Sequence, residues 1–239
     1  MTTSSTHDAN DAQHVKEESM EDLTTDETQT DRVVPFRRPL TEEDLIRMQI
    51  PARFWSVDLD QVPAGGTLRA PLLKYLGHVH EMHDQCVGIL MHGNNGRGKT
   101  SAGCLILMEA RRQGYTGLLL EAAKVKGIVI NRTEFDDDET LWERAQSVDF
   151  LVFDDLWKGT ADGKGFGEDL IDELIRTRSA NMKPTIITTN MGLAQAVAGG
   201  FVKQSTVQAL RESVVVLEVI GPNMRVETES AINEFFFGG

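Results

Sequence analysis

The segment from Gly93 to Thr100 carries the strongest chemical signal in this sequence of 239 residues, because it reads Gly-Asn-Asn-Gly-Arg-Gly-Lys-Thr. Two spaced glycines followed by lysine and threonine match the Walker A pattern of phosphate-binding loops. Glycine lets backbone N–H groups converge on a phosphate without Cβ clashes, and the start of a helix adds positive partial charge. We predict that Lys99 reaches the β- and γ-phosphates of a bound nucleotide and that the Thr100 hydroxyl binds Mg²⁺.

The whole loop and the first residues of the following helix are therefore assigned to nucleotide binding. The predicted binding residues are Gly93, Asn94, Asn95, Gly96, Arg97, Gly98, Lys99, Thr100 and Ser101. Lys99 is also a predicted catalytic residue, because it reaches the γ-phosphate. An ordinary glycine turn is the alternative, but an apolar strand pattern precedes the loop and a helical pattern follows it.

A second candidate group is Asp149-Phe-Leu-Val-Phe-Asp-Asp155, an apolar run that ends in two acids. Parallel α/β sheets bind ligands at the carboxyl ends of their strands, which is where this run delivers both carboxylates. We assign Asp154 to Mg²⁺, the Walker B role, and Asp155 to orienting or deprotonating the attacking water. A partly reversed assignment stays open, because the sequence gives no distances.

The third candidate is Asn190, at the end of the run Pro184-Thr-Ile-Ile-Thr-Thr-Asn. An amide at this position can sit between the γ-phosphate and the attacking water, so Asn190 is a predicted catalytic residue. The alternative is a strand followed by an ordinary asparagine turn, which is common for this pattern in isolation. The two preceding motifs favour the functional interpretation.

Short apolar runs alternate with helical patterns from residue 87 onwards. The expected strands are Val87–Met91, Gly117–Leu120, Phe150–Phe153, Thr185–Thr188 and Val214–Val219. The expected helices include Pro71–His83, Lys99–Arg112, Glu168–Arg178 and Thr206–Glu212, and Thr41 is expected to cap an earlier one. This alternation predicts an α/β, three-layer P-loop fold with a five-stranded parallel sheet that helices cover on both faces.

The first 35 residues differ from the rest in composition. They are rich in Thr, Ser, Asp, Glu and Gln and contain few large apolar residues, which predicts a disordered acidic tail. We divide the chain into this tail at 1–35, a helical lead-in at 36–86, the P-loop core at 87–226 and a C-terminal tail at 227–239.

The bulk composition restricts the class of protein further. The net charge of −13 argues against a protein that coats DNA by bulk attraction, although a local basic groove stays compatible with it. Cys86 and Cys104 are the only cysteines and lack framework spacing, which indicates a reducing, cytoplasmic compartment. No run approaches the roughly 18 apolar residues of a membrane helix, so no membrane partner is expected.

The motifs occur in the order and spacing of AAA+ ATPases, and the chain resembles most closely the DnaC/IstB-type group, which includes bacterial and phage helicase loaders. The matching stretches are Ile50-Pro-Ala-Arg-Phe54, Val87-Gly-Ile-Leu-Met-His-Gly93, Leu151-Val-Phe-Asp-Asp-Leu156, Pro184-Thr-Ile-Ile-Thr-Thr-Asn190 and Gly221-Pro-Asn-Met-Arg225. The resemblance implies ATP and Mg²⁺ as cofactors and ATP as a switch. It implies a replicative ring helicase and single-stranded DNA as partners, a homo-oligomer, and contact of Arg225 with the subunit's own nucleotide.

The chain departs from this family pattern where an arginine that acts on a neighbour's nucleotide is expected. The aligned stretch, Val207-Gln-Ala-Leu-Arg-Glu212, places Ala209 there. Arg178 is then a candidate for that role, as is Arg176. A contact of these two arginines to DNA is a further interpretation, and both also suit a helix C-terminus. We expect slow hydrolysis by the isolated protein. Two alternatives stay open: a transposition-helper ATPase of the same family, or a nucleotide-gated adaptor that does not hydrolyse ATP.

Overall fold

The computed structural model describes residues 37–125, 140–157, 166–225 and 234–237. The acidic segment 1–35 lies outside the described residues, so its disorder stays a prediction. Among the described residues, no helix has the length and apolar character needed to cross a membrane.

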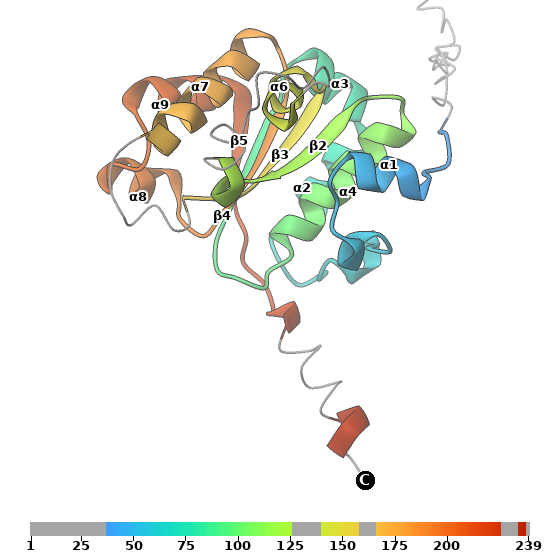
Figure 1. Cartoon of the computed structure of the whole chain (residues 1–239). Coiled ribbons are helices and arrows are strands. Elements are labelled where there is room, and N and C mark those ends of the chain that lie inside the picture. The colour runs from blue at the N-terminus through green and yellow to red at the C-terminus, as the bar shows by residue number, and fades with distance from the viewer. Residues whose placement is uncertain (1–36, 126–139, 158–165, 226–233, 238–239) are drawn as a thin grey trace, which may run out of the picture. The chain divides into compact units, whose positions relative to one another are not determined.

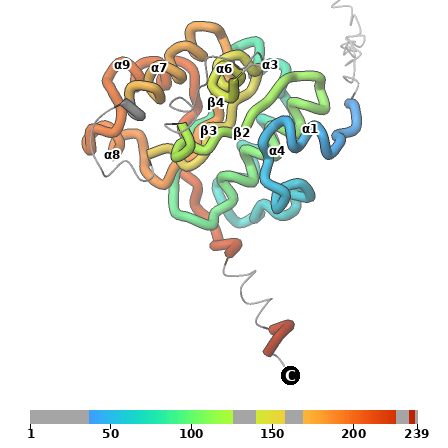
Figure 2. Tube along the Cα trace, in the orientation of Figure 1, coloured from blue at the N-terminus to red at the C-terminus, as the bar shows by residue number. Residues whose placement is uncertain are grey.

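The centre of the fold is a five-stranded parallel sheet, as predicted (Figures 1 and 2). Its strands are β1 (Gly88–His92), β2 (Gly117–Glu121), β3 (Phe150–Leu156), β4 (Thr185–Thr189) and β5 (Val214–Glu218). They lie in the order β2-β3-β4-β1-β5, and every neighbouring pair is parallel. The carboxyl ends of β1, β3 and β4 therefore meet at one edge of the sheet.

Helices pack on both faces of this sheet. The described helices are α1 (Glu42–Arg47), α2 (Arg69–Gly77), α3 (Val79–Asp84), α4 (Lys99–Arg112), α6 (Leu141–Ser147), α7 (Phe166–Ala180), α8 (Leu193–Ala198) and α9 (Gln204–Ser213), with short 3-10 turns at Ala52–Phe54, Leu59–Gln61 and Ala122–Lys124. Along β3, Phe150 and Val152 join a hydrophobic cluster with α2, α3 and α4, whereas Leu151 and Phe153 join a second cluster with α6, α7 and α9. This alternation produces the three predicted layers.

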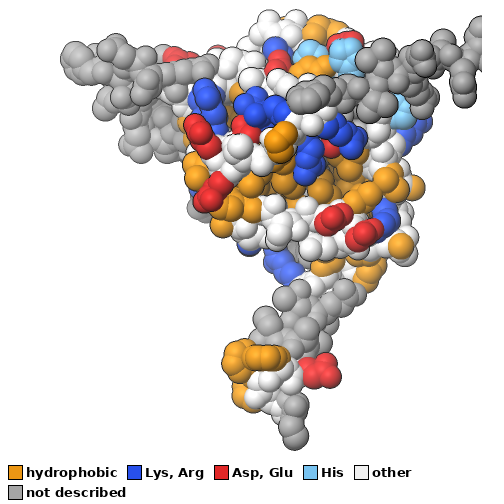
Figure 3. Space-filling view, turned by 90° about the vertical axis from the view of Figure 1, so that its right-hand side faces the viewer, with side chains coloured by type: hydrophobic (Ala, Val, Ile, Leu, Met, Phe, Trp, Pro, Cys, Tyr) orange, Lys and Arg blue, Asp and Glu red, His pale blue; other side chains and the backbone are white. Residues whose placement is uncertain are grey.

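The lead-in helix α1 begins as predicted at a capping box. Thr41 accepts a hydrogen bond from the Asp44 backbone, and the Asp44 side chain accepts one from the Thr41 backbone. The buried Asp44 carboxylate also contacts Arg38 and the Arg111 guanidinium (2.9 Å) at the end of α4. Burial raises the pKa of Asp44, but hydrogen bonds from Thr41, Arg111 and Arg38 outweigh it and hold the pKa well below its usual range. Figure 3 shows the right-hand side of the molecule as seen in Figure 1, and Lys and Arg side chains gather in its upper part.

The structure corrects the prediction of one helix over Pro71–His83. The helix ends at Gly77, and His78 takes φ −133° and ψ 32° before α3 begins. Glycine has a low helix propensity, and the His78 N–H bonds to the Tyr75 carbonyl (3.1 Å), which closes the last turn. The helices α6 and α8, which the sequence patterns did not indicate, are only 7 and 6 residues long.

Candidate nucleotide-binding site

The predicted phosphate loop joins β1 to α4, so it lies at the carboxyl edge of the sheet with a helix N-terminus behind it. Gly93, Gly96 and Gly98 have φ of 137°, 75° and 84°, a region that strongly favours glycine. A Cβ on Gly93 would lie 2.6 Å from the Val219 carbonyl oxygen, and a Cβ on Gly96 would lie 1.9 Å from Asn223 Oδ1. Gly93 is therefore required both by backbone conformation and by space, and Gly96 and Gly98 by backbone conformation.

Lys99 is buried and its ammonium group lies across the phosphate loop. Its Nζ donates to the carbonyl oxygens of Gly93 (2.6 Å) and Asn94 (2.9 Å) and to Asn190 Oδ1 (3.1 Å). The last contact joins the end of β4 to the start of α4. The structure thus brings two of the predicted catalytic residues, Asn190 and Lys99, together.

The acidic pair at the end of β3 faces the same loop. The Thr100 hydroxyl donates to Asp154 Oδ1 (2.9 Å), so the two residues assigned to Mg²⁺ are already adjacent. Thr188 on β4 also donates to Asp154 Oδ1 and accepts a hydrogen bond from the Asp155 N–H (3.0 Å). Carboxylate and hydroxyl oxygens are the ligands that Mg²⁺ prefers, so the donor set fits this ion.

Asp155 sits in an irregularity of the sheet. Phe153 pairs with Ile187, but Leu156 pairs with Thr189, so β3 has one more residue than β4 across this stretch. Asp155 has φ 56°, which is left-handed. Such bulges bend a strand and redirect its side chains, and they are common beside active sites. Asp154 and Asp155 therefore stand in different environments, the first buried and the second partly exposed.

The environment of Asp154 disfavours its own negative charge. Burial raises its pKa above the usual value, and the nearby Asp155 and Glu121 raise it further, while hydrogen bonds from Thr188 and Thr100 oppose the shift. Glu121 ends β2 and pairs with Asp154 across the sheet. A divalent cation placed here would stabilise the ionised form of Asp154.

These residues surround a cavity of about 410 Å³. The walls are formed by the phosphate loop, the acidic pair, a turn before α2 and the segment after β5: Arg53, Phe54, Asn95, Gly96, Arg97, Gly98, Lys99, Thr100, Ser101, Asp154, Asp155, Met224 and Arg225. The structure therefore gathers the predicted residues from Asn95 to Ser101, the predicted metal ligands and Arg225 around one space, whereas Gly93 and Asn94 contact Lys99 through their carbonyl groups. Asn190 joins them through its contact with Lys99.

Arg225 is held near the loop by its own segment. The Met224 N–H donates to the Gly96 carbonyl (2.9 Å), and the Arg225 N–H donates to Asn223 Oδ1 (3.1 Å). The exposed Arg225 side chain lines the cavity from there.

Four further residues belong to this site without having been assigned to it from sequence. The Thr188 hydroxyl bonds to the Asp154 carboxylate and to the Asp155 N–H. Arg53, Phe54 and Met224 line the cavity beside the loop. The Arg53 guanidinium lies over the Phe54 ring, 4.5 Å from its centroid. The only sequence signal for them was their place inside stretches that carry the family resemblance.

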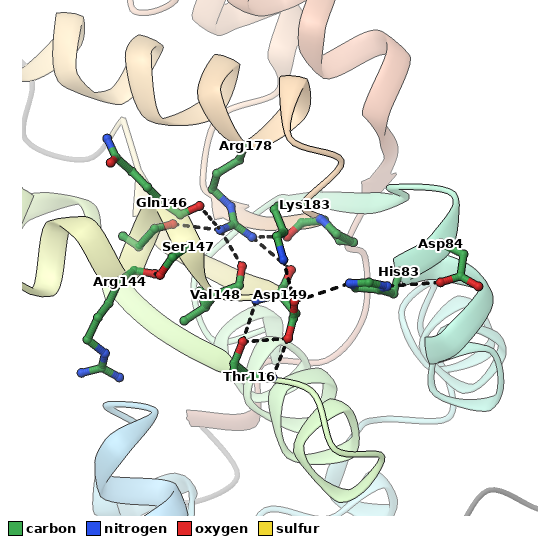
Figure 4. A network of polar contacts seen from close by, with 12 residues as sticks. His83, Asp84, Thr116, Arg144, Gln146, Ser147, Val148, Asp149, Arg178 and Lys183 are labelled. Atoms are coloured by element: carbon green, nitrogen blue, oxygen red, sulfur yellow. Dashed lines mark hydrogen bonds and ion pairs between the residues drawn. The ribbon is translucent and has the colours of Figure 1, made fainter. Parts of the chain in front are cut away.

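The structure excludes Arg178 from acting on a neighbouring subunit. Arg178 is fully buried, and its guanidinium donates to the carbonyls of Ala145, Gln146, Val148, Asp149 and Pro184 and to Thr185 Oγ1 (Figure 4). Burial lowers its pKa to about 9, while the nearby Cys86 and Asp149 oppose this shift, so the guanidinium stays charged at neutral pH. Arg178 therefore joins α6, α7 and the starts of β3 and β4.

Arg176 is exposed instead, one helical turn from Asp172, whose carboxylate it approaches at 3.9 Å. Together with Ala209 it lines an open groove between α7 and α9. Of the two arginines proposed on α7, Arg176 is thus the one that another molecule can reach.

Comparisons with known proteins address the fold. No protein-family model matches the chain, and no curated protein sequence matches it significantly. Solved structures do match it. The DnaC helicase loader has a TM-score of 0.58 at 19% identity over 71% of this chain and 100% of its own. DnaI has a TM-score of 0.58 at 17% identity over 74% of this chain and 94% of its own.

A third match is the replication initiator DnaA bound to AMPPCP and single-stranded DNA, with a TM-score of 0.51 at 17% identity over 78% of this chain and 56% of its own. At these identities the matches show the fold alone. The chain has the AAA+ P-loop fold, and its resemblance to the DnaC-type group is confirmed at the level of the fold.

Proposed function

We propose that this protein binds and hydrolyses Mg-ATP in the cavity at the carboxyl edge of the sheet. The observation that carries the proposal is the convergence of Lys99, Thr100 and Asp154 with Asn190 and Asp155 around one space. Lys99 and the loop N–H groups would hold the phosphates, and Thr100 and Asp154 would hold Mg²⁺. Mg²⁺ held there would neutralise charge on the phosphates, and Asp155 and Asn190 would orient the attacking water.

The base of the nucleotide is assigned to the wall formed by Arg53 and Phe54. The phosphate loop fixes the phosphates at one end of the cavity, so the base must extend along its remaining walls. The Phe54 ring and the Met224 sulfur offer apolar contacts there, and Arg53 offers a planar cation.

The biological role that fits best is loading or remodelling of a replicative ring helicase on single-stranded DNA. The support is the likeness in fold to the DnaC helicase loader and to DnaA bound to single-stranded DNA. A homo-oligomer and a cytoplasmic location belong to the same proposal. If the helicase-loading proposal fails, the experiments below would favour either the transposition-helper function or the adaptor function.

Calorimetric titration of ATP tests the site. Lys99→Ala should abolish tight binding and leave the fold intact, because it removes a cation rather than a packed apolar group. Lys74→Ala is the matched control, because Lys74 is exposed on α2 and does not line the cavity. Equal affinity of the Lys99 variant and the wild type would refute the assignment.

Steady-state turnover with and without single-stranded DNA separates an enzyme from an adaptor. Asp155→Asn should keep ATP binding but stop hydrolysis, because only the carboxylate charge near the water is lost. A pull-down from the native cell with a non-hydrolysable ATP analogue should then capture a ring helicase. Tight ATP binding without turnover under every condition would favour the adaptor, and filament formation on duplex DNA would favour the transposition helper.

A further inference from the structure

Two residues near the end of β3 have unusual backbone conformations. The described residues other than glycine with positive φ are Gln49, Cys86, Asp155, Trp157 and Met182. Gln49, Cys86 and Met182 follow the ends of α1, α3 and α7, where a left-handed residue is a common way to end a helix. Asp155 (φ 56°) and Trp157 (φ 64°) instead flank Leu156 at the end of a strand.

The left-handed conformation of Trp157 needs a compensating interaction. A side chain with a Cβ is strained at positive φ, and a bulky residue adopts this conformation only when its surroundings stabilise it. Trp157 is buried, with 6% of its surface exposed. It lies in the hydrophobic cluster of α7 and α9 and lines a small cavity with Ile171, Ile175 and Phe201.

Asp155 and Leu156 are also held by contacts with β4. Its N–H donates to the Thr188 hydroxyl (3.0 Å), and Leu156 is buried and pairs with Thr189. The backbone that carries the Asp155 carboxylate is therefore held by β4 at Asp155 and Leu156 and by the Trp157 ring two residues after Asp155. The Asp154 carboxylate accepts hydrogen bonds from Thr100 and from Thr188.

We propose that Trp157 is a positioning residue for Asp155. Its buried indole offsets the strain of the left-handed turn after β3, and that turn sets the direction of the Asp155 carboxylate at the nucleotide cavity. The inference rests on the proposed ATP hydrolysis, in which Asp155 orients the water. Loss of the ring would let the turn relax, so Asp155 would move. The residues proposed to bind Mg²⁺ and the phosphates would stay in place.

The first test compares the thermal stability of Trp157→Gly and Trp157→Ala. Both variants lose the ring, but only alanine keeps a Cβ in the left-handed conformation, so the glycine variant should have the higher Tm. Trp142 provides the matched control, because it is buried in the same cluster but lies in α6. There the order should reverse, since glycine is the poorer helix former. A higher Tm for Trp157→Ala than for Trp157→Gly would overturn the proposed strain.

The second test measures ATP turnover and ATP affinity of the folded variants at a temperature below each Tm. Trp157→Ala should lower kcat by on the order of 10-fold to 100-fold with KM and ATP affinity nearly unchanged. Trp157→Phe should restore most of the turnover, because it refills the site between α7 and α9. Trp142→Ala should lower the Tm without lowering kcat.

Three results separate the possible failures. Normal kcat in Trp157→Ala with a lowered Tm would show that the ring has a structural role only. A parallel loss of ATP affinity and kcat would show that the variant disturbs the whole site and would equally overturn the positioning role. A wild type without turnover both with and without single-stranded DNA would sink the proposed hydrolysis and this role with it, whereas the Tm order of the glycine and alanine variants would still decide whether the turn is strained.

Discussion

The hydroxyl of Thr188 on β4 donates a hydrogen bond to the Asp154 carboxylate on β3. The same hydroxyl accepts the N–H of the next residue, Asp155 (3.0 Å). One buried side chain therefore connects β4, which Asn190 follows, with the strand that presents both acids. The relative position of the proposed metal ligand and the proposed water-orienting group depends on this bridge.

Thr188→Val should destabilise the protein by about 1–2 kcal/mol, because it keeps the volume but leaves the Asp155 N–H without its acceptor. It should also weaken Mg-ATP binding, since Asp154 loses a hydrogen bond that orients it. Denaturant unfolding and calorimetry measure the two effects. Thr189→Val is the matched control, because Thr189 is equally buried but bonds to the Met191 N–H. Thr189→Val should lower the stability of the protein without weakening nucleotide binding.

Asp154→Asn should raise the Tm of the protein at neutral pH without nucleotide or Mg²⁺. The pKa of Asp154 is raised by burial, so its ionised form costs stability above that pKa, and the cost disappears below the usual value of 3.8. Asparagine removes the charge and still accepts from Thr100 and Thr188. Mg-ATP should stabilise the wild type far more than the variant. Thermal unfolding in both conditions checks the prediction, and a lower Tm of the variant without ligand would contradict it.

Arg178→Met should destabilise the protein by about 3 kcal/mol or more, because five buried carbonyl groups would lose a charged donor. Arg176→Met, one half-turn away on the exposed face of α7, should change stability by less than about 0.5 kcal/mol. Urea unfolding of both variants measures the difference. Equal stability of the two variants would show that the buried network contributes nothing.

Asp149 should make the protein sensitive to acid. Burial raises its pKa, but hydrogen bonds from Lys183 and from the Thr116 N–H and hydroxyl outweigh this effect and lower it to about 2. The stability that Asp149 contributes is then present above 3.8, the unfolded value, and is lost as the pH falls towards about 2. Asp149→Asn should be less stable than the wild type near neutral pH, with a smaller difference at about pH 2.5. Asp60→Asn, at an exposed position, is the control for both pH values.

The sequence predicted much of this structure because its signals were local. Apolar runs located all five strands, and the helix Lys99–Arg112 was predicted with its observed bounds. The roles that depend on burial were harder to predict. Arg178 was considered for a neighbour's nucleotide, but only the packed structure shows that backbone carbonyls enclose it.

Contacts between strands were likewise invisible in the sequence. Thr188 was visible only as part of a motif, because its bonds cross from β4 to β3. The bulge at Asp155 arises from a register shift between these strands, which no pattern within a single strand reveals.

Arg225→Ala should weaken binding of the subunit's own ATP, on the order of 10-fold for the loss of one exposed charge-assisted contact. The reason is geometric: the Met224 N–H bonds to the Gly96 carbonyl, which ties the segment to the phosphate loop, and the Arg225 side chain lines the cavity. Arg211→Ala is the matched control, because Arg211 is also exposed but does not line the cavity. Calorimetric titration of both variants with ATP and with ADP distinguishes a contact to the γ-phosphate, lost only with ATP, from a contact to the rest of the nucleotide. Equal ATP affinity of Arg225→Ala and Arg211→Ala would show that Arg225 lies near the nucleotide without binding it.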